Sequence, residues 1–279
     1  MIPLSNKYLV YSSLIRAKQD EHGFIEHEHC DALLFTGLVG CLPEINPKID
    51  AAYDPATKMW HRRPIEKSCF PVGSSSTISR DMLLGLAWYC YHNKRLDISE
   101  QVIKYAMHNF MIMGKAKNLK VKLGRCLMSP ALLATFAWVS YKLGGPSRWW
   151  LRWIPVQISN PKSIGFQAHL QVLHILLRKG LSGKKSRIGE KTLRWQHNRQ
   201  MKNPLFAYAA GETEQAMNML LNRHLWPSVK LPRSENRKPS WLMERDESEW
   251  VYSNVGHEHT GGDFLFVAGL LLGKITFHK

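Results

Sequence analysis

Apolar segments of helical length recur along the chain, and each follows a short polar stretch that favours a turn. No convincing series of alternating apolar and polar residues, which would indicate half-buried strands, accompanies them. The pattern therefore predicts a mostly helical protein. The expected helices occupy residues 31–42, 79–92, 99–113, 129–145, 165–181, 203–226 and 262–275.

Several of these segments begin with residues that stabilise the first turn of a helix. Asp31 opens the first segment, and Ser79 and Asp81 open the second. Their side chains can accept hydrogen bonds from free backbone amides, and a carboxylate also interacts favourably with the positive end of the helix dipole. Residues 129–145 start with Ser-Pro and end with Gly-Gly, as expected of a helix. These signals support the helical prediction.

The expected helices are of two kinds. Residues 31–42, 131–141 and 263–272 are apolar nearly all round, which is stable only where neighbours cover every face. Residues 99–113 and 212–225 carry a clear polar face and are expected outside. Paired inner and outer helices describe an all-α fold, an α/α toroid of helical hairpins, in which the first and last inner helices are neighbours.

One segment departs from this pattern. Residues 178–202 are strongly basic and poor in large apolar side chains, so we expect a long exposed loop that can dock an anionic polymer. The helices on either side each need a packing partner, so the loop is not a domain boundary. We therefore predict a single toroid domain over residues 1–279.

The composition permits a large core, because 44% of the 279 residues are hydrophobic. The formal net charge of +16 favours an anionic partner such as an acidic polysaccharide, a cell-wall polymer, nucleic acid or a membrane surface. No apolar segment is long enough to span a membrane, and the N-terminal one is too interrupted for a signal peptide. We therefore expect a soluble protein that is cytoplasmic or delivered without a signal peptide.

The cysteines favour an intracellular setting. Their number is odd, no CxxC pair occurs, and several lie within apolar segments, which predicts reduced and buried thiols. The five are Cys30, Cys41, Cys69, Cys90 and Cys126.

An acidic residue stands at the head of three glycine-containing apolar segments, DALLFTGLVG, SRDMLLGLAW and GDFLFVAGLLLG. In this pattern the chain resembles, over most of its length, the α/α-toroid, six-hairpin glycosidase-like proteins that process polysaccharides. It is shorter than most members of that group, which leaves room for fewer than six complete hairpins. The resemblance implies a glycan-binding cleft at the loop end, with carboxylates of the inner-helix starts acting on the sugar.

Glycoside hydrolysis needs two carboxyl groups, one protonated as the general acid and one ionised as the base or nucleophile. Asp31, Asp81 and Asp263 begin inner helices and are predicted to point into one funnel. A helix N-terminus stabilises an ionised aspartate, which suits the base or nucleophile, although capping alone is the common role of such a residue. We expect the acid to be Glu28 or Glu258 on the rim, or a partly buried aspartate.

Two His-Glu-His segments stand near the ends of the chain, HEHCD at 27–31 and HEHTGGD at 257–263. A closed ring would bring them side by side, and an extended backbone would place both imidazoles of each segment on one side. Such histidines with nearby carboxylates suit zinc or another divalent ion, although the spacing is not HExxH and hydrolysis by carboxylates needs no cofactor. The alternative metal ligands are His27, His29, His257 and His259.

The same segments permit a lyase-like mechanism. His29, His259 or Tyr252 would remove a proton beside the carboxylate of a uronic acid. Arg80 would neutralise that carboxylate. The common alternative for such histidines is hydrogen bonding to loops.

Cations alternate with aromatic side chains in WHRR at 60–63, RWWLRW at 148–153 and WLMERDESEW at 241–250. This pattern suits stacking on sugar rings or nucleobases, and packed loop anchors would show it too. The candidate substrate-binding residues, besides Arg80 and Tyr252, are Trp60, Arg62, Arg63 and Arg245.

Two classes of function fit these features. The first is a carbohydrate-active enzyme, glycoside hydrolase-like, that acts on an acidic or cell-envelope polysaccharide; a polysaccharide lyase or a metal-dependent hydrolase is its variant. The second is a non-catalytic basic helical scaffold that binds nucleic acid or a protein partner. An enzyme requires the helix-start carboxylates to converge, whereas a scaffold would leave them as dispersed caps.

Overall fold

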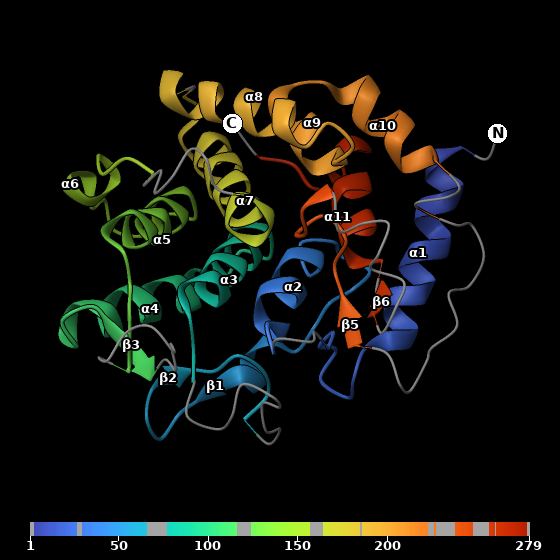
Figure 1. Ribbon diagram of the computed structural model, residues 1–279. Coiled ribbons are helices and arrows are strands. Elements are labelled where there is room, and N and C mark those ends of the chain that lie inside the picture. The colour runs from blue at the N-terminus through green and yellow to red at the C-terminus, as the bar shows by residue number, and fades with distance from the viewer. Residues whose placement is uncertain are drawn as a thin grey trace. The chain divides into compact units, whose positions relative to one another are not determined.

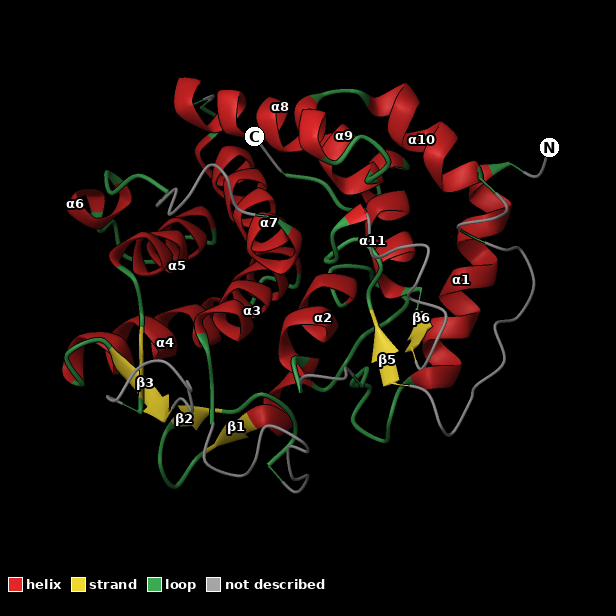
Figure 2. Cartoon of the chain, viewed as in Figure 1, coloured by secondary structure: helices red, strands yellow, loops and turns green. Residues whose placement is uncertain are grey.

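The structure, a computed structural model, describes residues 3–26, 30–65, 77–115, 124–156, 164–184, 186–222, 226, 238–247, 257–259 and 261–277. For residues 115, 238–240 and 257–259 it describes the backbone alone. Most of the described residues are helical, and the strands are short pairs (Figures 1 and 2). The all-α prediction is confirmed at this level, and ring closure as a toroid stays a prediction.

The chain divides into two compact units. The internal unit spans Gln19–Gln157, and the terminal unit combines Met1–Lys18 with Ile158–Lys279. A single domain over residues 1–279 stays a prediction.

The internal unit holds five helices of at least one turn, a 3₁₀ turn and two antiparallel strand pairs among its described residues. Its elements are α2 (Ala32–Val39), η1 (Ile49–Ala52), β1 (Tyr53–Asp54), β2 (Met59–Trp60), α3 (Arg80–His92), α4 (Leu96–His108), β3 (Ile112–Lys115), β4 (Arg125–Leu127), α5 (Pro130–Lys142) and α6 (Trp149–Arg152).

The terminal unit packs the first helix of the chain against helices from its C-terminal half. Its elements are α1 (Leu4–Lys18), α7 (Gly165–Ser182), α8 (Arg187–Arg199), α9 (Pro204–Ala210), α10 (Thr213–Leu221), β5 (Lys238–Ser240), β6 (His257–His259) and α11 (Gly262–Leu271).

Helix α2 is buried along its whole length and lies directly against α3 (Figure 1). A Cβ atom on Gly37 would overlap the carbonyl group of Gly85, and one on Gly85 would overlap the backbone of Leu34. The two backbones therefore touch, which only glycine permits. This contact explains why both apolar segments contain a glycine.

Helices α4 and α5 bear out the distinction between polar and apolar helices. Helix α4 buries Ile98, Val102 and Ile103 and leaves its other face polar, whereas α5 is buried over most of its length and packs against α3 and α4. The predicted start of α5 is also confirmed, because the Ser129 side chain accepts a hydrogen bond from the amide of Leu132. The Ser-Pro pair at the start of α5 therefore predicted this helix boundary correctly.

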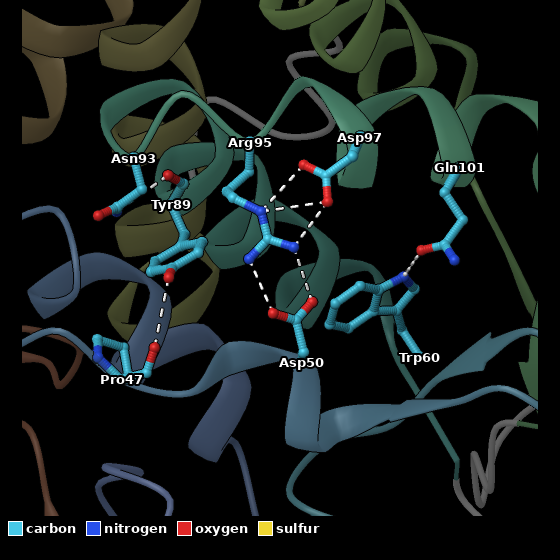
Figure 3. A network of polar contacts seen from close by, with 8 residues as sticks. All are labelled: Pro47, Asp50, Trp60, Tyr89, Asn93, Arg95, Asp97 and Gln101. Atoms are coloured by element: carbon cyan, nitrogen blue, oxygen red, sulfur yellow. Dashed lines mark hydrogen bonds and ion pairs between the residues drawn. The ribbon is translucent and has the colours of Figure 1, made fainter.

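A network of polar side chains ties η1 and β2 to the start of α4 (Figure 3). The Arg95 guanidinium donates to Asp50 at 2.8 and 2.9 Å and to Asp97 at 2.7 Å. These hydrogen bonds from Arg95 lower the pKa of Asp97. The Trp60 indole donates to the Gln101 side chain at 3.2 Å. The network is structural, since every member supports packing between elements.

In the terminal unit the apolar helix α11 is buried and contacts α1, α9 and α10. The Tyr11 ring stacks on Phe264 with centroids 4.0 Å apart, which joins α1 to α11. Strands β5 and β6 pair in parallel, with Lys238 opposite His257. The second His-Glu-His segment is therefore extended, the conformation that its alternation required.

The prediction of an exposed loop over residues 178–202 is wrong. Residues up to Ser182 continue α7, and α8 covers Arg187–Arg199. The side chain of Ser186 caps α8 by accepting from the amide of Gly189, and small or polar residues fill its buried face beside Leu193. Lysine and arginine are good helix formers, so a basic composition without large apolar residues does not exclude a helix.

The prediction of reduced thiols is confirmed for three cysteines and wrong for one. Cys41, Cys90 and Cys126 are buried and free, whereas Cys30 is disulfide-bonded. Cys69 lies outside the described residues. An odd number of cysteines means only that they cannot all be paired in disulfide bonds. The number therefore did not exclude a disulfide bond at Cys30. Of the helices described, none is both long enough and apolar enough to cross a lipid bilayer.

Candidate functional site

Arg62 links the starts of two buried helices in the internal unit. Its carbonyl oxygen accepts a hydrogen bond of 2.7 Å from the amide of Leu33, in the first turn of α2. Its own amide donates one of 2.9 Å to the carbonyl oxygen of Thr77, just before α3. The positive ends of the α2 and α3 dipoles therefore lie at the same end of the unit.

Asp31 stands at the N-cap position of α2 but its side chain makes no capping hydrogen bond. One carboxylate oxygen instead accepts from Arg62 Nη1 at 2.7 Å. The pair is withdrawn from water, because the two side chains are only 7% and 11% exposed. Asp31 therefore anchors a guanidinium group, whereas the sequence predicted a catalytic carboxylate with capping as the common alternative.

Asp81 and Arg80 occupy the first turn of α3, where Asp81 is half-buried and Arg80 is exposed. The buried thiol of Cys126, in β4, senses the charges of both side chains and of Arg62. Burial, followed by Asp81, raises the pKa of the Cys126 thiol to about 11. Arg80 and Arg62 act on it in the opposite direction. Two carboxylates and two guanidinium groups of the predicted site therefore surround these helix starts.

The neighbouring aromatic residue is not available for stacking on a sugar. Trp60 is 3% exposed, and its indole is held by Gln101. This burial contradicts the predicted binding role of Trp60. Arg63 is half-buried, with a guanidinium nitrogen 4.0 Å from a carboxylate oxygen of Glu26. Burial lowers the pKa of His61, and Asp54 partly opposes that shift.

Asp263 begins α11 in the terminal unit and is only 1% exposed. One carboxylate oxygen accepts from the amides of Leu242 and Met243 at 2.7 and 3.0 Å, and the other accepts from its neighbour Phe264 at 2.9 Å. Burial raises the pKa of Asp263 to about 6, against the effect of these three donors. The side chain fastens the turn at residues 241–244 to α11.

The remaining candidates lie beside this turn or outside the described residues. Arg245 is half-buried, and the carboxylate of its neighbour Glu244 contributes to the raised pKa of Asp263. Only the backbone of residues 257–259 is described, so the roles of His257, Glu258 and His259 stay predictions. The candidates outside the described residues are His27, Glu28, His29 and Tyr252.

The structure thus groups some predicted residues and leaves others untested. Asp31 and Asp81 belong to the internal unit, and Asp263 belongs to the terminal unit. The prediction that all three line one open funnel is wrong for Asp263, which is only 1% exposed and accepts from three backbone amides. Within the described ranges, no cluster of three or more His, Cys, Asp or Glu side chains could hold a metal ion.

The tryptophans of the RWWLRW segment are exposed, although they were not among the predicted site residues. Trp149, Trp150 and Trp153 are 64%, 51% and 74% exposed. The two arginines of the segment point inward instead. Arg148 donates to Glu100 at 2.6 Å, and the Arg152 guanidinium lies 3.6 Å from the centre of the Tyr141 ring. In this segment the arginines make contacts within the fold and the tryptophans are exposed, and the mixture of Arg and Trp in the sequence was the signal that could have indicated this.

No protein-family model matches the chain, and no curated protein or solved structure is significantly similar to it.

Proposed function

We propose that the protein is a glycoside hydrolase-like enzyme that acts on an acidic polysaccharide at the starts of α2 and α3. The observation that carries the proposal is the convergence of both helix starts on Arg62, which pairs with Asp31, while Asp81 stands in the first turn of α3. This geometry gives a half-buried carboxylate next to positive potential from two helix ends and two guanidinium groups.

Asp81 is the group proposed to react. A carboxylate in the first turn of a helix interacts favourably with the positive end of the helix dipole, and such a carboxylate can attack an anomeric carbon or activate a water molecule. The glycosidic C–O bond then breaks, and the leaving oxygen takes a proton from a second carboxyl group. The candidates for that donor are those that the sequence offers, Glu28, Glu258 or a partly buried aspartate, and Glu28 lies outside the described residues.

Asp31 is a positioning residue in this proposal. Its ion pair holds the guanidinium group of Arg62 at the start of α2. The guanidinium group of exposed Arg80 suits the carboxylate or sulfate of an acidic sugar. The cationic side chains are therefore the reason for proposing an acidic sugar as substrate, and the carboxylates are the reason for proposing hydrolysis.

The proposal is tested by incubating the protein with carboxylated, sulfated and neutral polysaccharides and following two products. New reducing ends without ultraviolet absorbance from unsaturated uronates indicate hydrolysis, and both signals together indicate a lyase. We expect hydrolysis of an acidic polymer that persists in the presence of a chelator. Reducing ends from none of the acidic polymers, loss of activity with chelator, or unsaturated products would each contradict the proposal.

A further inference from the structure

Helix α8 presents a row of cationic side chains on one face. Arg187, Lys191 and Arg194 are exposed and follow one another at intervals of four and three residues, and Asn198 continues the row four residues later. At 100° per residue these positions fall within about 60° of the helix circumference. The row, which we call the α8 stripe, is about 16 Å long at 1.5 Å per residue.

The helix beneath the stripe is held from its opposite side. Thr192, Leu193 and Gln196 are buried, and the Ser186 cap fixes the first turn. The side chain of His197 also lies in this buried face, 3.1 Å from Gln215 of α10. The cations therefore stand on a fixed support, which lowers the entropic cost of contacting a partner with several of them at once.

No acidic group neutralises the stripe from within α8. Its one carboxylate, Glu190, is turned to Lys179 of α7, with the ammonium nitrogen 2.8 Å from a carboxylate oxygen. Arg187, Lys191 and Arg194 make no ion pair within the part of the chain that the structure describes. Three like charges on one face repel one another, and a polyanion would remove that repulsion.

The chemistry of the stripe favours an acidic polysaccharide over single-stranded nucleic acid. Binding of single-stranded nucleic acid combines cations with exposed aromatic rings on which bases stack. Trp195 is the one Phe, Tyr or Trp residue of α8, and the Arg199 guanidinium lies over its ring, 4.9 Å from the ring centre. This ring face is therefore already in contact with a side chain of the same helix. Asn198 adds an amide, which can both donate to and accept from sugar hydroxyl groups.

We propose that the α8 stripe is a docking surface for an acidic polysaccharide, outside the residues proposed to react. The polymer class rests on the proposed function, since the substrate of the α2 and α3 site would carry the same charges. Carboxylate groups along the polymer would contact Arg187, Lys191 and Arg194 in turn, and their counterions would be released on binding.

The test is equilibrium binding of fluorescently labelled polygalacturonate, alginate and hyaluronan at several salt concentrations. The stripe variant is Arg187→Gln/Lys191→Gln/Arg194→Gln. The control variant is Arg16→Gln/Lys48→Gln/Lys104→Gln, which removes the same charge from scattered exposed positions. Each is also measured with Asp81→Asn, so that cleavage of the polymer does not contribute.

We expect the stripe variant to bind at least one of these polymers about tenfold or more weakly, with a shallower dependence on salt, by counterion release. The control should stay within about twofold of the unmodified protein. Equal losses in the two variants, or binding of none of the three polymers at low salt, would overturn the proposal. Tighter binding of single-stranded DNA than of the polymers would overturn the choice of occupant.

The two proposals fail separately. A polymer that binds through α8 but is never cleaved would reject the proposed function and leave the docking surface in place. Cleavage that proceeds normally, with binding unaffected by the stripe variant, would reject the docking surface alone.

Discussion

The buried ion pair between Arg62 and Asp31 should make a measurable contribution to the free energy of unfolding. Replacing Arg62 with Met keeps much of its length and its backbone hydrogen bonds, but leaves the Asp31 carboxylate buried without its guanidinium partner. Replacing Asp31 with Leu in addition removes the buried charge. The two single variants and the double variant form a mutant cycle that isolates the interaction.

The expected magnitude follows from the burial of the pair. Removing one partner of a buried pair costs about 3–5 kcal/mol, whereas breaking an exposed pair costs about 1 kcal/mol or less. With side chains only 7% and 11% exposed, Arg62→Met should lower the free energy of unfolding by about 3 kcal/mol. The double variant should recover part of this loss, with a coupling of about 2 kcal/mol.

Urea unfolding followed by circular dichroism measures these free energies. The matched control is Lys179→Met, which breaks a pair whose side chains are 34% and 24% exposed and should cost about 1 kcal/mol or less. A loss for Arg62→Met no larger than that of the control would refute a buried pair between α2 and residues 60–63. A double variant as unstable as the sum of the singles would refute their coupling.

Three further outcomes follow from the structure. Gly37→Ala or Gly85→Ala should lower the free energy of unfolding by about 2 kcal/mol or more in the urea assay, since the added methyl group meets the facing backbone; a neutral result would refute the close contact of α2 with α3. Burial raises the pKa of Asp263 from 3.8 to about 6. The stability that this group contributes, about 3 kcal/mol, should therefore be present below pH 4 and be lost as the pH rises through 6. Asp263→Asn should abolish this decrease in the free energy of unfolding, and an unchanged pH profile would show that another group causes it. Burial raises the pKa values of Cys41 and Cys126, so both thiols should react with a disulfide reagent at pH 8 only after unfolding; prompt labelling of the folded protein would refute their burial.

Features that depend on neighbouring residues in the sequence were predicted well. The Ser129 cap followed by Pro130 placed the start of α5, and unbroken apolar runs identified α2 and α11 as buried helices. Helix boundaries that depend on the backbone conformation of a single residue were harder to predict from the sequence. The expected helix over 203–226 is broken at Gly211, which adopts a left-handed conformation between α9 and α10.

Features that depend on partners distant in the sequence were not predictable. The sequence indicated that Asp31 begins a helix, but the pairing with Arg62 depends on how residues 60–63 cross the start of α2. Asp263 was expected in an open funnel, whereas amides from residues 242 and 243 hold it in the core of the terminal unit. Helix type was encoded locally, and the environment of each carboxylate was set by tertiary contacts.

Reaction of Asp81 with an acidic polysaccharide is tested by measuring the turnover of Asp81→Asn. The matched control is Glu214→Gln, an exposed acid at the corresponding position in the first turn of α10. On the polymer that the unmodified protein cleaves fastest, Asp81→Asn should lower kcat by about a thousandfold with the fold intact, and the control should leave it unchanged. Equal turnover by Asp81→Asn and Glu214→Gln would contradict the account.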